Sequence, residues 1–200
     1  MSRARRRAWP LLWCALCACG GAAAQVAGGS VNLIDDGALS RGDGVMALNL
    51  SAGAGNAQTN LAVFGMADGA LALRAASSQR SASAYQRARG MAVSEIGAGA
   101  FSGGDGLLAL NQAAGDANTQ ANLVLVGIAS VSELSAEQLG VAGIAPPPAP
   151  AAGTARRVPI AAIADTAFVG AHGIVQVNQL AGSGNSTANI FALSISFGAQ

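Results

Sequence analysis

The sequence predicts an all-β protein in which three repeats form a β-arch or β-solenoid-like stack with irregular linkers. The first observation is an internal repeat, because a unit of about 30 residues occurs three times in a chain of 200 residues. The second is the alternation of polar and apolar residues within each unit, which is typical of strands. The third is composition, since aromatic residues make up only 4% of the chain and glycine occurs 27 times. Close stacking of backbones suits such small residues better than a core of large side chains does.

Each unit carries amides and a glycine at fixed spacings. Counting from a lead asparagine, a glycine follows at position +4, asparagines at +7 and +11, and glutamine or threonine at +9. These positions are Asn49, Gly53, Asn56, Gln58 and Asn60, then Asn111, Gly115, Asn118, Gln120 and Asn122, then Asn178, Gly182, Asn185, Thr187 and Asn189. The units span Ile34–Phe64, Ile96–Val126 and Ile163–Leu193. Agreement at so many positions identifies a structural repeat rather than an accident of composition.

The chain begins with a segment that is typical of export. Arginines cluster at positions 3–7 and precede an apolar run, Ala8–Ala18, which is too short to span a bilayer. Ala22–Ala24 before Gln25 fits a cleavage site, so we expect a signal peptide at residues 1–24. The alternative is a lipoprotein signal in which Cys19 is lipidated. All three cysteines lie in this segment, so the chain cleaved after residue 24 is exported without disulfides.

The repeats divide the rest of the chain into five parts. We expect repeat 1 at 25–64, a linker at 65–95, repeat 2 at 96–126, a Pro- and Ala-rich linker at 127–162, and repeat 3 at 163–200. The linkers are expected to be irregular except for three short features. These are a weak helix within Gly65–Ser94, a helical turn at Ser135–Leu139 closed by Gly140, and a polyproline segment at Ala145–Pro150.

Within each unit the alternation predicts two strands around a glycine-rich turn. In the first unit the strands are Val45–Ser51 and Asn56–Phe64, and the turn is Ala52–Gly55, where glycine reaches positive φ at little cost. The corresponding strands are Leu107–Asn111 and Asn118–Val126 in the second unit, and Gly173–Asn178 and Asn185–Phe197 in the third. Period-2 alternation places the amides at +7, +9 and +11 on one face of the second strand.

Stacking gives the repeated amides a physical use. An amide carries both a donor and an acceptor, so amides at equivalent positions of stacked units can bond in a continuous column. Successive rungs lie about 4.8 Å apart, a distance that suits such bonds. A simpler interpretation, polar turn residues on a surface, accounts for one copy but not for the alternation in three. We therefore expect a solenoid whose open strand edges recruit further chains.

The spacing of Gly, Asn and Gln resembles the repeats of Fap-type bacterial functional amyloid fibre subunits. The resemblance rests on the repeat positions between Asn49 and Asn60 and on their equivalents in the other two units. It implies a secreted fibre subunit or adhesin that self-associates in biofilm, with other fibre subunits and an outer-membrane export pore as partners. Thr187 at a glutamine position and the absence of a C-terminal Cys-x-Cys depart from the family pattern. They leave open a major subunit, a minor subunit or an adhesin relative.

Signals for catalysis or cofactor binding are weak. The single histidine, His172, occupies a turn position that Asp43 and Asp105 occupy in the other units. The cleaved chain has no cysteine or second histidine for a metal cluster or a nucleophile–base pair, so we expect neither an enzyme nor a cofactor. Cleavage would leave 7 basic residues (11 − 4) against 10 acidic ones, which argues against nucleic-acid binding. The alternative to a fibre subunit is a soluble periplasmic or lipid-anchored, chaperone-like accessory solenoid of a secretion or fibre system.

Overall fold

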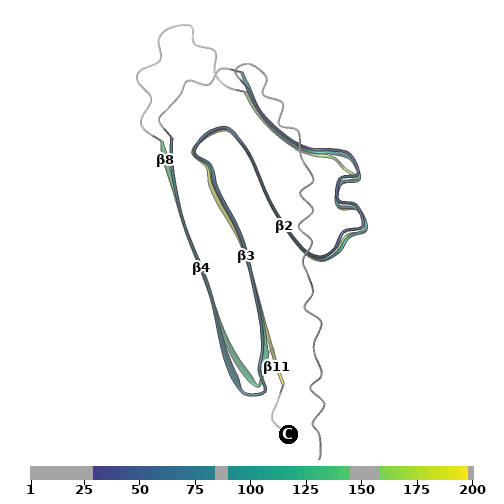
Figure 1. Ribbon diagram of the computed structural model, residues 1–200, viewed down its shortest axis with the longest axis vertical. Coiled ribbons are helices and arrows are strands. Elements are labelled where there is room, and N and C mark those ends of the chain that lie inside the picture. The colour runs from purple at the N-terminus through teal and green to yellow at the C-terminus, as the bar shows by residue number, and fades with distance from the viewer. Residues whose placement is uncertain (1–28, 84–89, 145–157, 198–200) are drawn as a thin grey trace, which may run out of the picture.

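The protein is a stack of three similar rungs of β-strand (Figure 1). The computed structural model describes residues 29–83, 90–144 and 158–197. The first rung contains β1 (Ser30–Ile34), β2 (Asp43–Ala52), β3 (Ala57–Met66) and β4 (Ala70–Ser83). The second contains β5 (Met91–Ile96), β6 (Asp105–Ala114), β7 (Thr119–Ala129) and β8 (Val131–Ile144), and the third contains β9 (Val158–Ile163), β10 (His172–Ala181) and β11 (Ser186–Ser196). The predicted all-β stack of three repeats is confirmed.

Equivalent strands of successive rungs pair in parallel with no shift in register. The sheets have the orders β1-β5-β9, β10-β6-β2, β11-β7-β3 and β4-β8. Asn111 therefore pairs with Asn49 on one side and with Asn178 on the other. A slip of one residue would turn every amide to the opposite face of its sheet, so the fixed repeat spacing specifies this register.

Apolar layers lie outside a polar centre. Viewed along the stack, the rungs superpose and each chain segment follows the same serpentine path, with β2 leading through a tight arch into β3 and then into β4 (Figure 1). Ile34, Phe101 and Leu110 belong to the apolar cluster beside the sheet of β2, β6 and β10. Leu123 and Leu134 belong to a second cluster beneath β4 and β8. The two middle sheets are left to face each other through their amides.

An aromatic pair extends the first apolar cluster beyond the strands. Phe101 and Phe168 stack with ring centroids 5.3 Å apart and an interplanar angle of 4°. Both residues, and Leu39 at the equivalent place in the first rung, have positive φ values of 57°, 61° and 55°. The turns before β2, β6 and β10 thus share one unusual backbone conformation, which places the three side chains at equivalent positions of successive rungs.

The linkers contain more strand than the sequence predicted. The helical turn expected at Ser135–Leu139 is wrong, because these residues lie within β8, and the weak helix expected before Ser94 is replaced by β4 and β5 in the described residues. Leu73 and Leu134 are partly buried against the neighbouring sheet, so tertiary packing overrides weak local propensity. The expected polyproline segment lies outside the described residues. Among those residues, no helix is long and apolar enough to cross a membrane.

Candidate functional site: the stacked amides

A glycine in each rung positions the two amide-bearing strands face to face. Gly53, Gly115 and Gly182 have φ values of 118°, 116° and 115°, a region that only glycine enters easily. A β-carbon on Gly53 or Gly115 would come well within 3.0 Å of the carbonyl oxygen of the next rung's glycine, closer than real β-carbons approach. The turn therefore needs glycine twice, for its own conformation and for the close approach of the next rung.

The lead asparagines form one column of hydrogen bonds through the stack. Nδ2 of Asn178 donates to Oδ1 of Asn111 at 3.0 Å, and Nδ2 of Asn111 donates to Oδ1 of Asn49 at 2.9 Å. Two further columns, at +7 and +11, have the same form. Their bonds are Asn185 to Asn118 at 3.0 Å, Asn118 to Asn56 at 3.0 Å, Asn189 to Asn122 at 3.0 Å and Asn122 to Asn60 at 2.9 Å.

The lead and +11 columns also bond to each other within every rung. Nδ2 of the +11 asparagine donates to Oδ1 of the lead asparagine in all three rungs. The distances are 3.0 Å for Asn60 to Asn49, 3.1 Å for Asn122 to Asn111, and 3.1 Å for Asn189 to Asn178. The centre of the stack is thus a continuous amide network that joins two sheets and three rungs.

The asparagine columns have a direction. In all six column bonds the donor belongs to the later rung and the acceptor to the earlier one. Backbone carbonyls fix the orientation of the amides: Nδ2 of Asn111 also donates to Thr59 O at 2.9 Å, and Nδ2 of Asn178 to Ala121 O at 2.8 Å. The stack therefore has a donor end at the first rung and an acceptor end at the third.

The middle rung buries its amides completely. Asn111, Asn118, Gln120 and Asn122 each have 0% exposed surface, while their equivalents in the outer rungs are partly open, except Asn178, which is also buried. A buried amide without partners costs about 1–3 kcal/mol, so burial on this scale requires the network to be satisfied. The network is therefore a structural requirement of the stack.

The chain matches a known protein family over most of its length. A family model described as "Functional amyloid protein FapB/FapC family" matches residues 20–196, which include all three rungs. The chain belongs to the FapB/FapC family. This is a family of structural amyloid proteins rather than of enzymes. No solved structure matches the chain.

The +9 position of this FapB/FapC-family chain departs from a simple column. Nε2 of Gln58 donates to Oε1 of Gln120 at 2.6 Å, which is opposite in direction to the asparagine columns. Thr187 is in register with Gln120 but its hydroxyl donates to Oδ1 of Asn178 at 2.8 Å instead. Nε2 of Gln120 donates to the carbonyl oxygen of Asn178 at 3.0 Å. In the third rung the shorter Thr187 thus bonds to the lead asparagine of its own rung, and the glutamine column ends at Gln120.

Sequence reasoning missed a further pair of stacked amides, Gln112 and Gln179, which ties the outer β1-β5-β9 sheet to the stack. Gln112 is fully buried, and its Nε2 donates to Asn32 O at 3.1 Å and Glu95 O at 2.9 Å. Nε2 of Gln179 donates to Oε1 of Gln112 at 3.1 Å. Both glutamines directly follow a lead asparagine, but the first unit has Leu50 at that position. The glutamine that could have revealed this contact is therefore present in the second and third units and absent from the first.

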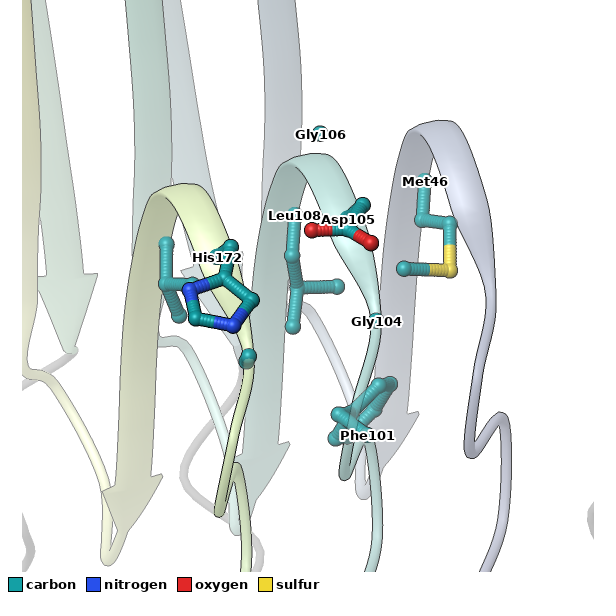
Figure 2. A pocket seen from close by; sticks show the side chains of 9 residues that line it. Met46, Phe101, Gly104, Asp105, Gly106, Leu108 and His172 are labelled. Carbon is teal, nitrogen blue, oxygen red and sulfur yellow. The ribbon is translucent and has the colours of Figure 1, made fainter.

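A small hollow lies where the strands β2, β6 and β10 begin, and Figure 2 shows its lining. His172 and Asp105 lie side by side there, with Met46, Phe101 and Leu108 around them. His172, Asp105 and Asp43 are in register, as the repeat alignment predicted. Each rung thus contributes one of these three polar side chains. The described part of the chain holds no group of three metal-ligating side chains.

Proposed function

We propose that this FapB/FapC-family chain is an exported subunit of a cell-surface amyloid fibre, in which copies stack on one another as the rungs stack within one copy. One observation carries the proposal: an unused amide donor lies at the first-rung end of the asparagine network and an unused amide acceptor at its third-rung end. Within the described residues, Nδ2 of Asn49 donates to no partner and Oδ1 of Asn189 accepts from none. A second copy supplies the missing partner at each end.

Backbone geometry supports the same contact. The strands of the first and third rungs each pair on one edge only, so their other edges are available for parallel pairing. A β-carbon on Gly182 would meet no atom nearer than 3.5 Å, and one on Gly44 would meet none within 4 Å. At their equivalents inside the stack a β-carbon would clash with a neighbouring rung, on Gly115 with the third rung and on Gly106 with the first. The two end surfaces are thus shaped as the internal contacts are, with space where a rung would sit.

The direction of the columns favours head-to-tail addition. The third rung of one copy offers acceptors such as Oδ1 of Asn189, and the first rung of the next offers donors such as Nδ2 of Asn49. Two first rungs in contact would oppose donor to donor, and two third rungs would oppose acceptor to acceptor. Head-to-tail contacts do not close on themselves, so they generate a fibre rather than a dimer.

Export, surface location and a role in adhesion or biofilm complete the proposal. The arginine cluster, the apolar run and Ala22–Ala24 support secretion of a chain that begins at Gln25. Lipidation of Cys19 would instead support an anchored component. Other fibre subunits and an outer-membrane pore are the partners that this role requires.

Incubation of purified residues 25–200 tests the proposal. The expected result is thioflavin-positive fibrils whose diffraction shows the spacing of about 4.8 Å between stacked strands. Added fragments of fibril should shorten the lag, since each presents ready-made edges. A chain that stays monomeric with unchanged β-structure under these conditions would support the soluble accessory solenoid and contradict the fibre.

A further inference from the structure

We propose that each junction between stacked copies has a vacant strand position in the sheet of β4 and β8, which is called the outermost sheet here. An extended segment of another polypeptide binds there by β-augmentation. This inference rests on the proposed head-to-tail fibre. We call this vacant position the lane. It lies over the contact between β11 of one copy and β3 of the next. Its occupant is a parallel strand with small or apolar side chains at every second position.

The outermost sheet covers junctions between rungs rather than single strands. β4 contacts both β3 and β7, and β8 contacts both β7 and β11. A β-carbon on Gly140 of β8 would lie 2.6 Å from the hydroxyl of Ser186 in the third rung and 2.9 Å from that of Thr119 in the second. Each strand of this sheet therefore seals one junction, and within one copy both junctions are sealed.

The next junction is left uncovered by the described residues. The apolar side chains of β11 that face outward, Ile190 and Ala192, are exposed, with 51% of the Ile190 surface open. Leu61 and Val63 hold the same positions in the first rung, which is also an end rung, and are only partly exposed. β4 packs on Leu61 and Val63, whereas Ile190 and Ala192 stay exposed although β8 contacts β11.

In a head-to-tail fibre this gap becomes a lane one strand wide. The order of the outermost sheet would be β4, β8, lane, and then β4 of the next copy. The lane is bordered by the unpaired edge of β8 and the unpaired edge of the following β4, each 14 residues long. An extended strand there gains backbone hydrogen bonds on both sides, which is the binding mode of sheet-edge recognition.

The lane also defines what the occupant looks like. Its floor is Ile190 and Ala192, so the inward side chains are small or apolar, as Leu73 and Ala75 are in β4. Arg74 of β4 and Glu137 of β8 form an exposed ion pair on the outer face of this sheet, so the outward side chains of the occupant are polar as well. Donors are needed along both edges, so the occupant has no proline in its paired stretch.

The linker that follows β8 does not meet these requirements. Four of its residues, Pro146, Pro147, Pro148 and Pro150, have no backbone donor. The occupant is therefore assigned to another polypeptide.

A labelled peptide of residues 69–83, which contains β4, is the probe, because β4 is the strand that β8 is observed to pair with. Fibres of residues 25–200 are grown first, and the peptide is then titrated onto washed fibres. The expected result is saturable binding of about one peptide per subunit, distributed along the fibre. A peptide with Leu71→Asp and Leu73→Asp should not bind.

Matched variants of the fibre locate the site. Ile190→Lys should weaken peptide binding at least about tenfold, since an ammonium would be buried in the lane without a partner. Ile160→Lys, at a residue of the same rung that is 41% exposed on the opposite outer sheet, should leave binding unchanged. If Ile190→Lys fibres do not grow, Ile190→Thr keeps the strand propensity and serves in its place.

Four outcomes would overturn the inference. Binding only at fibre ends would mean that the peptide imitates an incoming copy. Binding only after residues 146–155 are replaced by a Gly-Ser segment of equal length would assign the lane to the chain's own linker. Saturation that Ile190→Lys does not change would place the peptide elsewhere. If residues 25–200 form no fibres, the proposed function fails and the lane fails with it.

Discussion

A β-carbon on Gly115 would overlap the carbonyl oxygen of Gly182, so these two residues bring the second and third rungs as close as backbone allows. Gly182 itself has no comparable neighbour. The same turn is therefore covered by a neighbouring rung at Gly115 and uncovered at Gly182. In a fibre the next copy would cover Gly182 as well. This difference permits mutations that separate folding of the subunit from addition of the next copy.

We expect Gly115→Ala to unfold the stack and Gly182→Ala to block growth. Both substitutions force alanine to a φ near 115°, at a cost of about 1–3 kcal/mol, so this strain cancels in the comparison. Only Gly115→Ala adds a clash within the chain. Urea unfolding of the monomer should show the larger loss for Gly115→Ala, and seeded fibre growth should fail for Gly182→Ala. Normal growth of Gly182→Ala fibres would contradict the proposed contact between copies.

Mixing two end-specific variants tests the direction of assembly. Gly44→Ala should block the first-rung end, and Gly182→Ala the third-rung end, because their β-carbons project into the space of the next copy. In head-to-tail assembly neither variant associates alone, but the two together form a dimer through their intact ends. Analytical ultracentrifugation measures the result. Dimers formed by either variant alone would indicate head-to-head contacts instead.

Removing amides from the middle rung should lower the stability of the monomer more than removing them from an outer rung. In the assembled fibre the two changes should have equal effects. The triple change of Asn118, Gln120 and Asn122 to Ala removes fully buried amides that bond on both sides. At about 1 kcal/mol for each net hydrogen bond and about 1–3 kcal/mol for each orphaned partner, the unfolding free energy of the monomer should fall by several kcal/mol. Fibre growth should stop while secretion continues.

The matched control for that triple variant is the change of Asn56, Gln58 and Asn60 to Ala. These residues have neighbours on one side only, so the monomer should lose roughly half as much stability. In the fibre every rung has two neighbours, so growth should be impaired to the same extent by both variants. Equal loss in the monomer, or normal polymerisation of the middle-rung variant, would contradict the ladder.

The missed pair of stacked glutamines predicts that Gln112→Leu loosens the outer sheet of β1, β5 and β9. The variant removes the donor to Asn32 O and Glu95 O and leaves Gln179 without its acceptor. The expected cost is about 1–3 kcal/mol, with faster amide hydrogen exchange in β5 than in β7. Gln179→Leu, in an end rung and only half buried, should cost less. Uniform exchange in both strands would show that Gln112 does not hold this sheet.

N-terminal sequencing of the secreted protein tests the expected cleavage. The result should be a chain that begins at Gln25. A blocked N-terminus with a lipid on Cys19 would establish the lipoprotein alternative and place the protein on a membrane.

The repeat spacing was sufficient to predict the stack, because equivalent positions in parallel rungs must superpose. The register of Asn49, Asn111 and Asn178 follows from the alignment of the three units alone. The strands β4 and β8 could not be predicted in this way. Their inward residues include small ones such as Ala75 and Ala136, whose contrast with the outward residues is weak. Packing on Leu123 and its neighbours decides their conformation, and packing of that kind is invisible in a local pattern.

Gln112 was missed for a different reason. Internal repeats reveal the positions where all copies agree, and Leu50 breaks the agreement at this one. In the first rung an apolar residue fits, since Leu50 packs against the apolar cluster of Ile34 and Phe101. The direction of the hydrogen-bond columns was also outside the reach of the sequence, because an amide offers donor and acceptor equally until its backbone partners are known.

The parallel register has a kinetic consequence. Ladder partners in this chain lie 62 or 67 residues apart, and the described strands form no hairpin pairs. A folding chain must therefore close loops of that length before the first ladder bond forms, which makes spontaneous folding slow. A finished end rung removes this delay, because an arriving chain can pair one segment at a time against strands already in place. The topology thus keeps an isolated chain unpaired for a long time and makes contact with an existing stack the faster route to the folded state.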